Sequence, residues 1–446
     1  MDIPEELQFR DVRKQAPVII AKESRQILPQ NGTKFQQSDS GTTQIVFRVP
    51  NEESSSTDLS TMWITADLTV RGLINTTFSA NLRNKYNGQS KKLFLHDTQA
   101  STAILSCCDS IESAIRQVHI LVNGSELERH DYYNFEESIM NMHTNNANFS
   151  NSIGAGCMLM NINHWEKSKL FLNNSAALVG AGTADGVSNT IQVSFPLRWT
   201  GVANLRSLIP TAFLGGGQSA VEIRIFLETA QRFLIAGLFT STANQGHSNE
   251  FTPHATPLTY ELDNVRLNYD VAITSDAYTS SLKSYLASNQ LTLPIDTYYT
   301  TQFDIPSSTN GWLNFTISTQ MSDISAIFIA FCIADEQSSY AYASTDRFVK
   351  PGNLKQARLQ INGKPYPNVN IQLSGDVELP EAEAYQYLMK ALRQNCSLEV
   401  IGNANANRDS KQLLAINRGD ADAAIAVATL GYREIPSGSG INYGRN

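Results

Sequence analysis

The sequence has few charged residues, no long hydrophobic run and no excess of basic side chains. Charged residues make up 17% of the 446 residues and hydrophobic residues 41%, which excludes a disordered chain and a highly charged coiled coil. The longest apolar run, residues 324–334, is about half as long as a membrane-spanning helix. The formal net charge of -8 argues against a protein that binds nucleic acid through a basic surface. We therefore expect a soluble, globular, mildly acidic protein with room for two domains.

Cysteine is scarce, and a secretion signal is lacking. The five cysteines show no CxxC spacing; they are Cys107, Cys108, Cys157, Cys332 and Cys396. An odd number of scattered cysteines favours buried thiols in a reducing compartment over disulfides or metal ligands. Residues 1–15 contain no apolar segment of the kind that a signal peptide needs, so we do not expect secretion by that route.

Alternation of apolar and polar residues is the strongest pattern in the chain. It occurs in residues 45–49, 191–197, 221–228, 265–273 and 313–317. Each of these segments predicts a strand with one face in a core and the other face toward water or a neighbour. The chain is therefore expected to be mainly β.

Helical spacing is confined to three short stretches. The first begins at Asn134, which can cap a helix together with Glu137 three residues later. The second begins at Ser275, and the third runs from Pro380 to Leu392. Three short helices among many strands favour helices in the loops of β-sandwiches over a βαβ protein.

A short internal repeat suggests two copies of one β-domain. Asn123-Gly124 and Asn362-Gly363 each follow a predicted strand and precede a predicted helix. Asn-Gly favours the positive φ angles of a tight hairpin turn. The turn-rich residues 246–257 mark the expected break between the two halves.

Four regions show no periodic pattern. Residues 75–103 and 141–189 are predicted to be long exposed loops, of the kind that often carry function. Residues 1–42 are predicted to form a polar arm, and residues 436–446 a flexible tail.

Known catalytic motifs are missing from the sequence. It contains no nucleophile elbow, Walker A loop, HExxH pair or EF-hand loop. His130 and Asp131 are neighbours on a strand and so point to opposite faces, whereas Glu136 and Glu137 are interpreted as solvated charges on a helix. We therefore expect no catalytic residues, no bound cofactor and no metal ligands.

Four segments, in this order and spacing, carry a resemblance to a known family. They are VHILVNGSELERHDYYNFEESI (118–139), FPLRWTGVANLRSLIPTAFLGGGQSAVEIRIFLE (195–228), YELDNVRLNYDVAITSDAYTSSL (260–282) and LQINGKPYPN (359–368). With them the chain resembles the double jelly-roll major capsid proteins of icosahedral double-stranded DNA viruses, in particular the Polinton-like virus, virophage and adintovirus group. The resemblance covers about residues 43 to 435.

This resemblance implies an all-β fold of two tandem eight-stranded jelly-roll β-sandwiches with a few short helices in loops. The implied domains are an N-terminal arm (1–42), a first jelly roll (43–258), a second jelly roll (259–435) and the C-terminal tail (436–446). In this scheme residues 260–282 supply the opening strand and helix of the second jelly roll.

The same resemblance implies a structural function without enzymatic activity. The chain would trimerise into pseudo-hexagonal capsomers and tile an icosahedral shell in the virion, after assembly inside the host cell. Its partners would be copies of itself and the minor capsid and penton proteins, with no sequence-specific nucleic acid. Residues 1–42 would contact an internal membrane or scaffold.

Two other classes of function stay open at this point. A lectin-like tandem β-sandwich, or a virion spike that binds a receptor, predicts an exposed aromatic platform for glycans. A β-sandwich hydrolase requires a convergent acid–base pair, which the sequence does not display.

Overall fold

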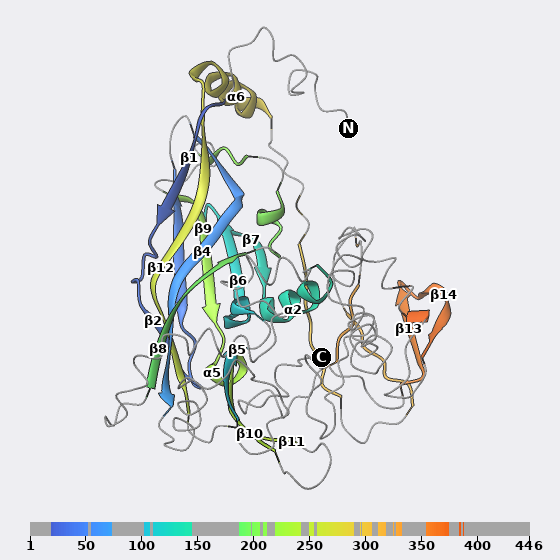
Figure 1. Ribbon diagram of the computed structural model, residues 1–446. Coiled ribbons are helices and arrows are strands. Elements are labelled where there is room, and N and C mark those ends of the chain that lie inside the picture. Colours follow the sequence, from blue (N-terminus) through green and yellow to red (C-terminus); the bar gives the residue numbers. More distant parts are fainter. Residues whose placement is uncertain are drawn as a thin grey trace, which may run out of the picture.

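The computed structural model describes most of the chain between residues 19 and 289 and shorter segments after it (Figure 1). The described ranges are 19–51, 55–73, 102–107, 110–144, 187–197, 199–205, 208–211, 219–241, 249–253, 257–289, 295, 297–305, 311–317, 324, 327–331, 354–373, 383–384 and 387. Most of the two long predicted loops and the whole C-terminal tail lie outside these ranges.

The first sheet, called sheet A, has the strand order β1-β12-β4-β8. Its strands are β1 (Ile19–Ile27), β4 (Ser55–Leu73), β8 (Val187–Pro196) and β12 (Thr259–Thr274), with the short β2 (Phe35–Gln37) also paired to β12. All neighbours in sheet A are antiparallel. Because β1 and β2 pair with different parts of β12, they form together one interrupted edge strand.

The second sheet, called sheet B, has the strand order β3-β9-β6-β7. Its strands are β3 (Gln44–Pro50), β6 (Ile115–Val122), β7 (Ser125–His130) and β9 (Ser219–Leu227), again all antiparallel. The alternating segments 45–49, 191–197, 221–228 and 265–273 thus fall on β3, β8, β9 and β12, as their pattern predicts.

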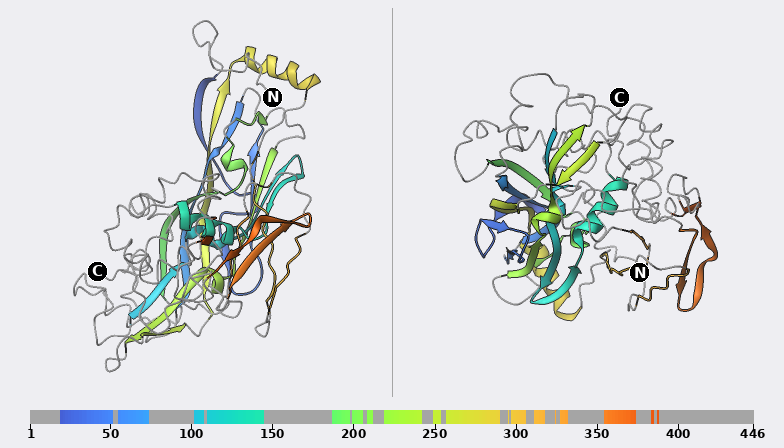
Figure 2. Two further views of the ribbon diagram at one scale, coloured as in Figure 1. Left: turned by 90° about the vertical axis from the view of Figure 1, so that its right-hand side faces the viewer. Right: turned by 90° about the horizontal axis from the view of Figure 1, so that it is seen from below.

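The two sheets follow the chain order of a jelly roll (Figures 1 and 2). With β1 and β2 counted as one, the strands of these two sheets lie, in chain order, in sheets A, B, A, B, B, A, B and A. Antiparallel strands that cross between two sheets in this order make the two Greek keys of a jelly roll. The predicted all-β fold is confirmed, and residues 19–274 contain one complete jelly roll.

A single hydrophobic core lies between the two sheets. Phe47 and Val118 of sheet B and Leu68 and Leu267 of sheet A belong to the same buried cluster. Their burial follows from the period-two pattern, which turns every second side chain of a strand inward. Packing in this core therefore determines which faces of β6 and β7 can contact elements outside the two sheets.

Further elements lie in the connections and beyond the jelly roll. A three-stranded sheet consists of β5 (Thr102–Cys107), β10 (Leu234–Ser241) and β11 (Asn249–Pro253). The helices are α2 (Tyr133–Thr144), α5 (Ala230–Phe233), α6 (Asp276–Ser288) and the 3-10 turns η2 (Ile111–Ala114) and η5 (Val202–Asn204). Strands β13 (Gln356–Ile361) and β14 (Lys364–Gln372) form a separate hairpin beside the jelly roll (Figure 1).

Both Asn-Gly turns are confirmed. Asn123 and Gly124 have φ angles of 51° and 79° and connect β6 to β7. Asn362 and Gly363 have φ angles of 50° and 77° and connect β13 to β14. Positive φ at both central residues matches the twist of the two strands, which is why Asn and Gly occupy these positions.

Two of the three predicted helices are described in full. Helix α2 begins at Tyr133, and α6 begins after Ser275, whose side chain accepts a hydrogen bond from the Tyr278 amide. Helix α2 thus begins one residue before the predicted cap Asn134, and the Glu137 carboxylate accepts a hydrogen bond from the Ser110 hydroxyl. Only a few helical residues of the third, within 383–387, belong to the described chain.

The structure differs from the predicted domain boundaries at both ends of the first jelly roll. Residues 19–27 were expected in a polar arm, but they form β1 because β12 supplies backbone partners from Leu267 to Thr274. Residues 259–274 were expected to open a second jelly roll, but β12 lies between β1 and β4 in sheet A. The predicted break at residues 246–257 includes β11, which pairs with β10. The second jelly roll stays a prediction.

One alternating segment is not a strand. Residues 311–317 lie outside helix and strand, although Leu313, Phe315 and Ile317 alternate with polar residues. A strand needs a neighbour to pair its backbone N–H and C=O groups, and no described strand pairs with this segment. The side chains of Phe315 and Ile317 are exposed.

Candidate functional site

Buried polar and charged residues gather where β7 ends and α2 begins. They include Glu112, Glu128, His130, Asn134, Glu136, Glu137 and Glu228. Charged side chains are almost never fully buried unless they are paired, so this cluster, called the acid–histidine cluster, is the part of the described chain where a special role is to be sought.

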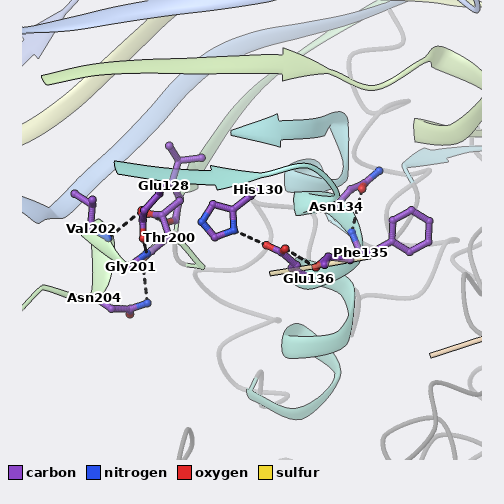
Figure 3. Close-up of polar contacts among 11 residues, drawn as sticks. Glu128, His130, Asn134, Phe135, Glu136, Thr200, Gly201, Val202 and Asn204 are labelled. Atoms are coloured by element: carbon purple, nitrogen blue, oxygen red, sulfur yellow. Dashed lines mark hydrogen bonds and ion pairs between the residues drawn. The ribbon is translucent and has the colours of Figure 1, made fainter. Parts of the chain in front are cut away.

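Strand β7 turns two polar side chains inward. Glu128 and His130 are two residues apart and both are buried, whereas Leu127 between Glu126 and Glu128 is 45% exposed. Residues at i and i+2 of a strand share a face, so both side chains point from β7 toward α2 and the loop at residues 199–205 (Figure 3). The inward face of β7 is therefore polar.

His130 and Glu136 form a buried pair. The Nδ1 atom of His130 lies 2.7 Å from Oε2 of Glu136, and the two residues are only 1% and 6% exposed (Figure 3). The other carboxylate oxygen of Glu136 accepts a hydrogen bond of 2.5 Å from the Thr300 hydroxyl. Glu136 thus joins β7, α2 and a segment that follows α6.

Glu128 holds the loop at residues 199–205. Its two carboxylate oxygens accept hydrogen bonds from the amides of Gly201 (2.6 Å) and Val202 (3.3 Å), at the start of η5 (Figure 3). Within the same loop, Thr200 accepts a hydrogen bond from the Asn204 side chain through its carbonyl oxygen. A carboxylate at the free amides of a helical turn is a favourable arrangement.

Burial and charge act on His130 in opposite directions. Burial alone lowers the pKa of His130, but the hydrogen bond and negative charge of Glu136, aided by Glu128 and Asp131, raise it above its ordinary value. Burial raises the pKa of Glu128, although His130 and the amides of Val202 and Gly201 oppose this. Both shifts favour a bound proton in the folded protein.

A second part of the cluster connects α2 to the opposite side of the jelly roll. The Asn134 side chain donates a hydrogen bond of 2.9 Å to the Glu228 carboxylate, and it also accepts one from the Phe135 amide. The Tyr260 hydroxyl donates a hydrogen bond of 2.6 Å to the Glu228 carbonyl oxygen. Burial, together with the charge of Glu228, raises the pKa of Tyr260 well above its usual range. Tyr260 is therefore a neutral hydrogen-bond donor.

The geometry suits structural support better than chemistry on a substrate. A general base must reach a proton on a bound substrate, and the His130 side chain is completely buried. No group of three or more His, Cys, Asp or Glu residues within the described ranges is placed to hold a metal ion. The acid–histidine cluster is thus arranged to hold α2, the 199–205 loop and residue 300 together.

No described helix is long and apolar enough to span a membrane.

The predictions about individual residues had mixed outcomes. The structure gives His130 and Asp131 different hydrogen-bond partners, Glu136 and Arg129, although the charge of Asp131 helps to raise the pKa of His130. The interpretation of Glu136 and Glu137 as solvated charges is wrong, since both are buried. Helix α2 packs against η2 and β6, and Thr300 covers another side of it, so adjacent residues on the helix are both enclosed.

Comparison with known proteins gives matches in solved structures alone. No protein-family model and no curated protein matches the sequence. The chain is similar to the Faustovirus major capsid protein, with 12% identity, a TM-score of 0.32 and coverage of 64% of this chain and 59% of that chain. It is also similar to the mavirus major capsid protein, with 10% identity, a TM-score of 0.24 and coverage of 61% of this chain and 51% of that chain. A chain of the Sputnik virophage matches with 9% identity, a TM-score of 0.30 and coverage of 62% of this chain and 52% of that chain.

Two of these relatives are named major capsid proteins. The match spans between 52% and 59% of the length of the first two solved chains. At 9–12% identity the likeness is one of fold alone.

Proposed function

We propose that this chain is a viral major capsid protein, a structural subunit without enzymatic activity. The observation that carries the proposal is the strand order β1-β12-β4-β8 facing β3-β9-β6-β7. This jelly-roll order occurs in viral capsid domains, lectins and cupins. The capsid function is favoured among these because the four ordered sequence segments resemble double jelly-roll capsid proteins.

A second jelly roll in the later part of the chain is part of this proposal. The β13–β14 hairpin repeats the β6–β7 hairpin, with an Asn-Gly turn in the same left-handed conformation. Helical residues follow each hairpin, at Tyr133–Thr144 and within 383–387. Ala384 packs in a small apolar cluster with Leu373, close to β14. These features support two copies of one domain, the first within 19–274 and the second after α6.

The proposed assembly is a homotrimer that forms pseudo-hexagonal capsomers of an icosahedral shell. Three chains with two jelly rolls each supply six similar lobes around a threefold axis. The low share of charged residues, 17%, suits extensive lateral contacts, since buried charges cost free energy when they lose water. Minor capsid and penton proteins would be the other partners, and the virion would be the location.

The size of the purified full-length protein tests this proposal. Mass photometry should give a trimer that persists on dilution, and concentrated protein should form closed or sheet-like arrays. A protein that stays monomeric at all concentrations would contradict the proposal.

A lectin-like or receptor-binding function is the second candidate, because aromatic side chains are exposed after α6. Tyr299, Phe303, Trp312 and Phe315 are all exposed, and the ring centroids of Phe303 and Phe315 lie 4.9 Å apart. Exposed aromatic faces are what a glycan platform requires. Titration with a panel of oligosaccharides, monitored by tryptophan fluorescence, tests this candidate. Trp312→Ala is the control variant. Saturable binding by a monomer would support it, and a trimer without sugar binding would exclude it.

A further inference from the structure

The segment after α6 is fastened to the first jelly roll by the acid–histidine cluster. The Thr300 hydroxyl donates a hydrogen bond of 2.5 Å to the Glu136 carboxylate of α2. Ile295 packs against the hydrophobic core of the jelly roll. Ile295 and Thr300 therefore fasten this segment through one apolar contact and one hydrogen bond to a buried acid.

His130 lies between Glu128 and Glu136. Its Nδ1 atom bonds to Glu136, and it attracts Glu128 electrostatically from the same face of β7. The charged groups that act on His130 are Glu136, Glu128 and Asp131, all negative. Asp131 is itself paired with the exposed Arg129.

Among the described residues, two other elements near His130 contribute neutral groups. The 199–205 loop presents backbone amides to Glu128, and Thr300 presents a hydroxyl to Glu136. On α2, Tyr133 places its ring edge-on to the imidazole, and Glu137 bonds to Ser110. Protonated His130 is thus the positive charge that balances Glu128 and Glu136 in this cluster.

Loss of the proton from His130 would leave two buried carboxylates facing a neutral imidazole. Buried charges without a partner of opposite sign are strongly unfavourable. The structure can relieve this repulsion at the weakest attachment. That attachment is the segment around Thr300, because a single hydroxyl of a residue outside helix and strand bonds to Glu136, whereas Glu128 holds the 199–205 loop through two backbone amides.

We propose that the acid–histidine cluster is a proton-dependent clasp, in which protonated His130 keeps the segment around Thr300 attached to α2. Deprotonation of His130 releases this segment while sheets A and B stay folded. The clasp thereby makes the attachment of the later part of the chain to the first jelly roll sensitive to pH. This inference does not depend on the capsid proposal.

The direction of the pH effect follows from the two shifts. The pKa of His130 is raised, so protonated His130 contributes fully to the stability of the clasp at pH values below its ordinary pKa of 6.5. This stabilisation is lost as the pH rises through the raised pKa. The pKa of Glu128 is raised as well, which also favours the protonated, folded form at lower pH. The clasp should therefore open in neutral to alkaline solution.

Hydrogen–deuterium exchange of the full-length protein at about pH 6 and about pH 9 tests this proposal, with exchange rates corrected for the intrinsic effect of pH. Protection of peptides that cover residues 297–305 should fall by about tenfold or more between the two values. Peptides from β9 should keep their protection. Equal protection of 297–305 at both pH values would overturn the proposal.

Variants separate the role of the proton from a general loss of stability. His130→Gln should have low protection of 297–305 at both pH values, and His119→Gln, on the neighbouring β6, should behave as the unmodified chain does. If His130→Gln does not fold, Glu136→Gln replaces it. This variant removes one negative charge, so the loss of protection at high pH should become smaller. An undiminished pH response in whichever variant folds would contradict the clasp.

Discussion

Three buried acids of the cluster have their own hydrogen-bond donors. Glu128 accepts from the Gly201 and Val202 amides, Glu136 from Thr300, and Glu228 from Asn134. Removing one partner of a buried polar pair costs more than the pair contributes, because the remaining group stays unsatisfied. Single substitutions in this cluster are therefore expected to act as strongly as substitutions in the apolar core.

Tyr260→Phe tests this expectation at one hydrogen bond. The change keeps the ring, which packs on Phe233 at 4.7 Å between centroids, and removes the hydroxyl that donates to the Glu228 carbonyl. We expect the free energy of unfolding to fall by about 1–2 kcal/mol in urea denaturation. Tyr285→Phe, at a residue of α6 that is 45% exposed, is the control and should change the free energy of unfolding by less than about 0.5 kcal/mol. Equal effects of the two changes would contradict this account of Tyr260.

Hydrophobicity could not predict the residues of this cluster. In β7 the apolar Leu127 faces outward and the polar Glu128 and His130 face inward, the reverse of the usual pattern. What buries them is α2, which follows β7 directly, together with the 199–205 loop and residue 300, which come from two distant parts of the chain. The sequence did contain a signal for this cluster, because Glu128 and His130 are spaced i, i+2 just before a helix that carries Glu136. This signal could be used only if the position of the helix was known.

Among the elements, those with a complete local signal were predicted correctly. The Asn123-Gly124 turn, the Ser275 cap and the alternation in β9 each specify a conformation through near neighbours in sequence. Strand β1 lacks such a signal, since five consecutive residues within it are exposed. Its extended form depends on pairing with β12, more than two hundred residues away.

Gly124→Ala tests the local signal of the β6–β7 hairpin. Gly124 has a φ angle of 79°, and nothing lies within 4 Å of where a Cβ atom would be. The expected loss is therefore backbone strain alone, about 1 kcal/mol of unfolding free energy. Ser125→Ala, at the exposed first residue of β7, is the control and should change the free energy of unfolding by less than about 0.5 kcal/mol. A neutral effect of Gly124→Ala would mean that the turn does not depend on a left-handed residue.

At the scale of the whole molecule, closure of the jelly roll joins its two chain ends. Ile19 pairs with Thr274 and Ile27 pairs with Leu267, so the first strand and the last lie side by side in sheet A. The sequence pattern revealed strands and turns, but it could not show that residues 19–27 and 259–274 belong to one sheet. This is why the predicted boundaries at residues 42 and 258 differ from the structure.

Two deletions separate the first strand from the residues before it. Removal of residues 1–18 leaves β1 intact, so the protein should keep its melting temperature and its trimeric state, while shell assembly is impaired under the capsid proposal. Removal of residues 1–30 takes away β1 and its pairing with β12, and should lower the melting temperature by about 5 °C or more. Differential scanning fluorimetry and mass photometry measure both effects. Equal melting temperatures for the two deletions would contradict the role of β1.

Electron microscopy of the purified full-length protein tests the central claim most directly, that the chain contains two jelly rolls and assembles in threes. Class averages should show threefold particles with six similar lobes around the axis. Particles with a single jelly-roll lobe per chain, or particles without threefold symmetry, would contradict it.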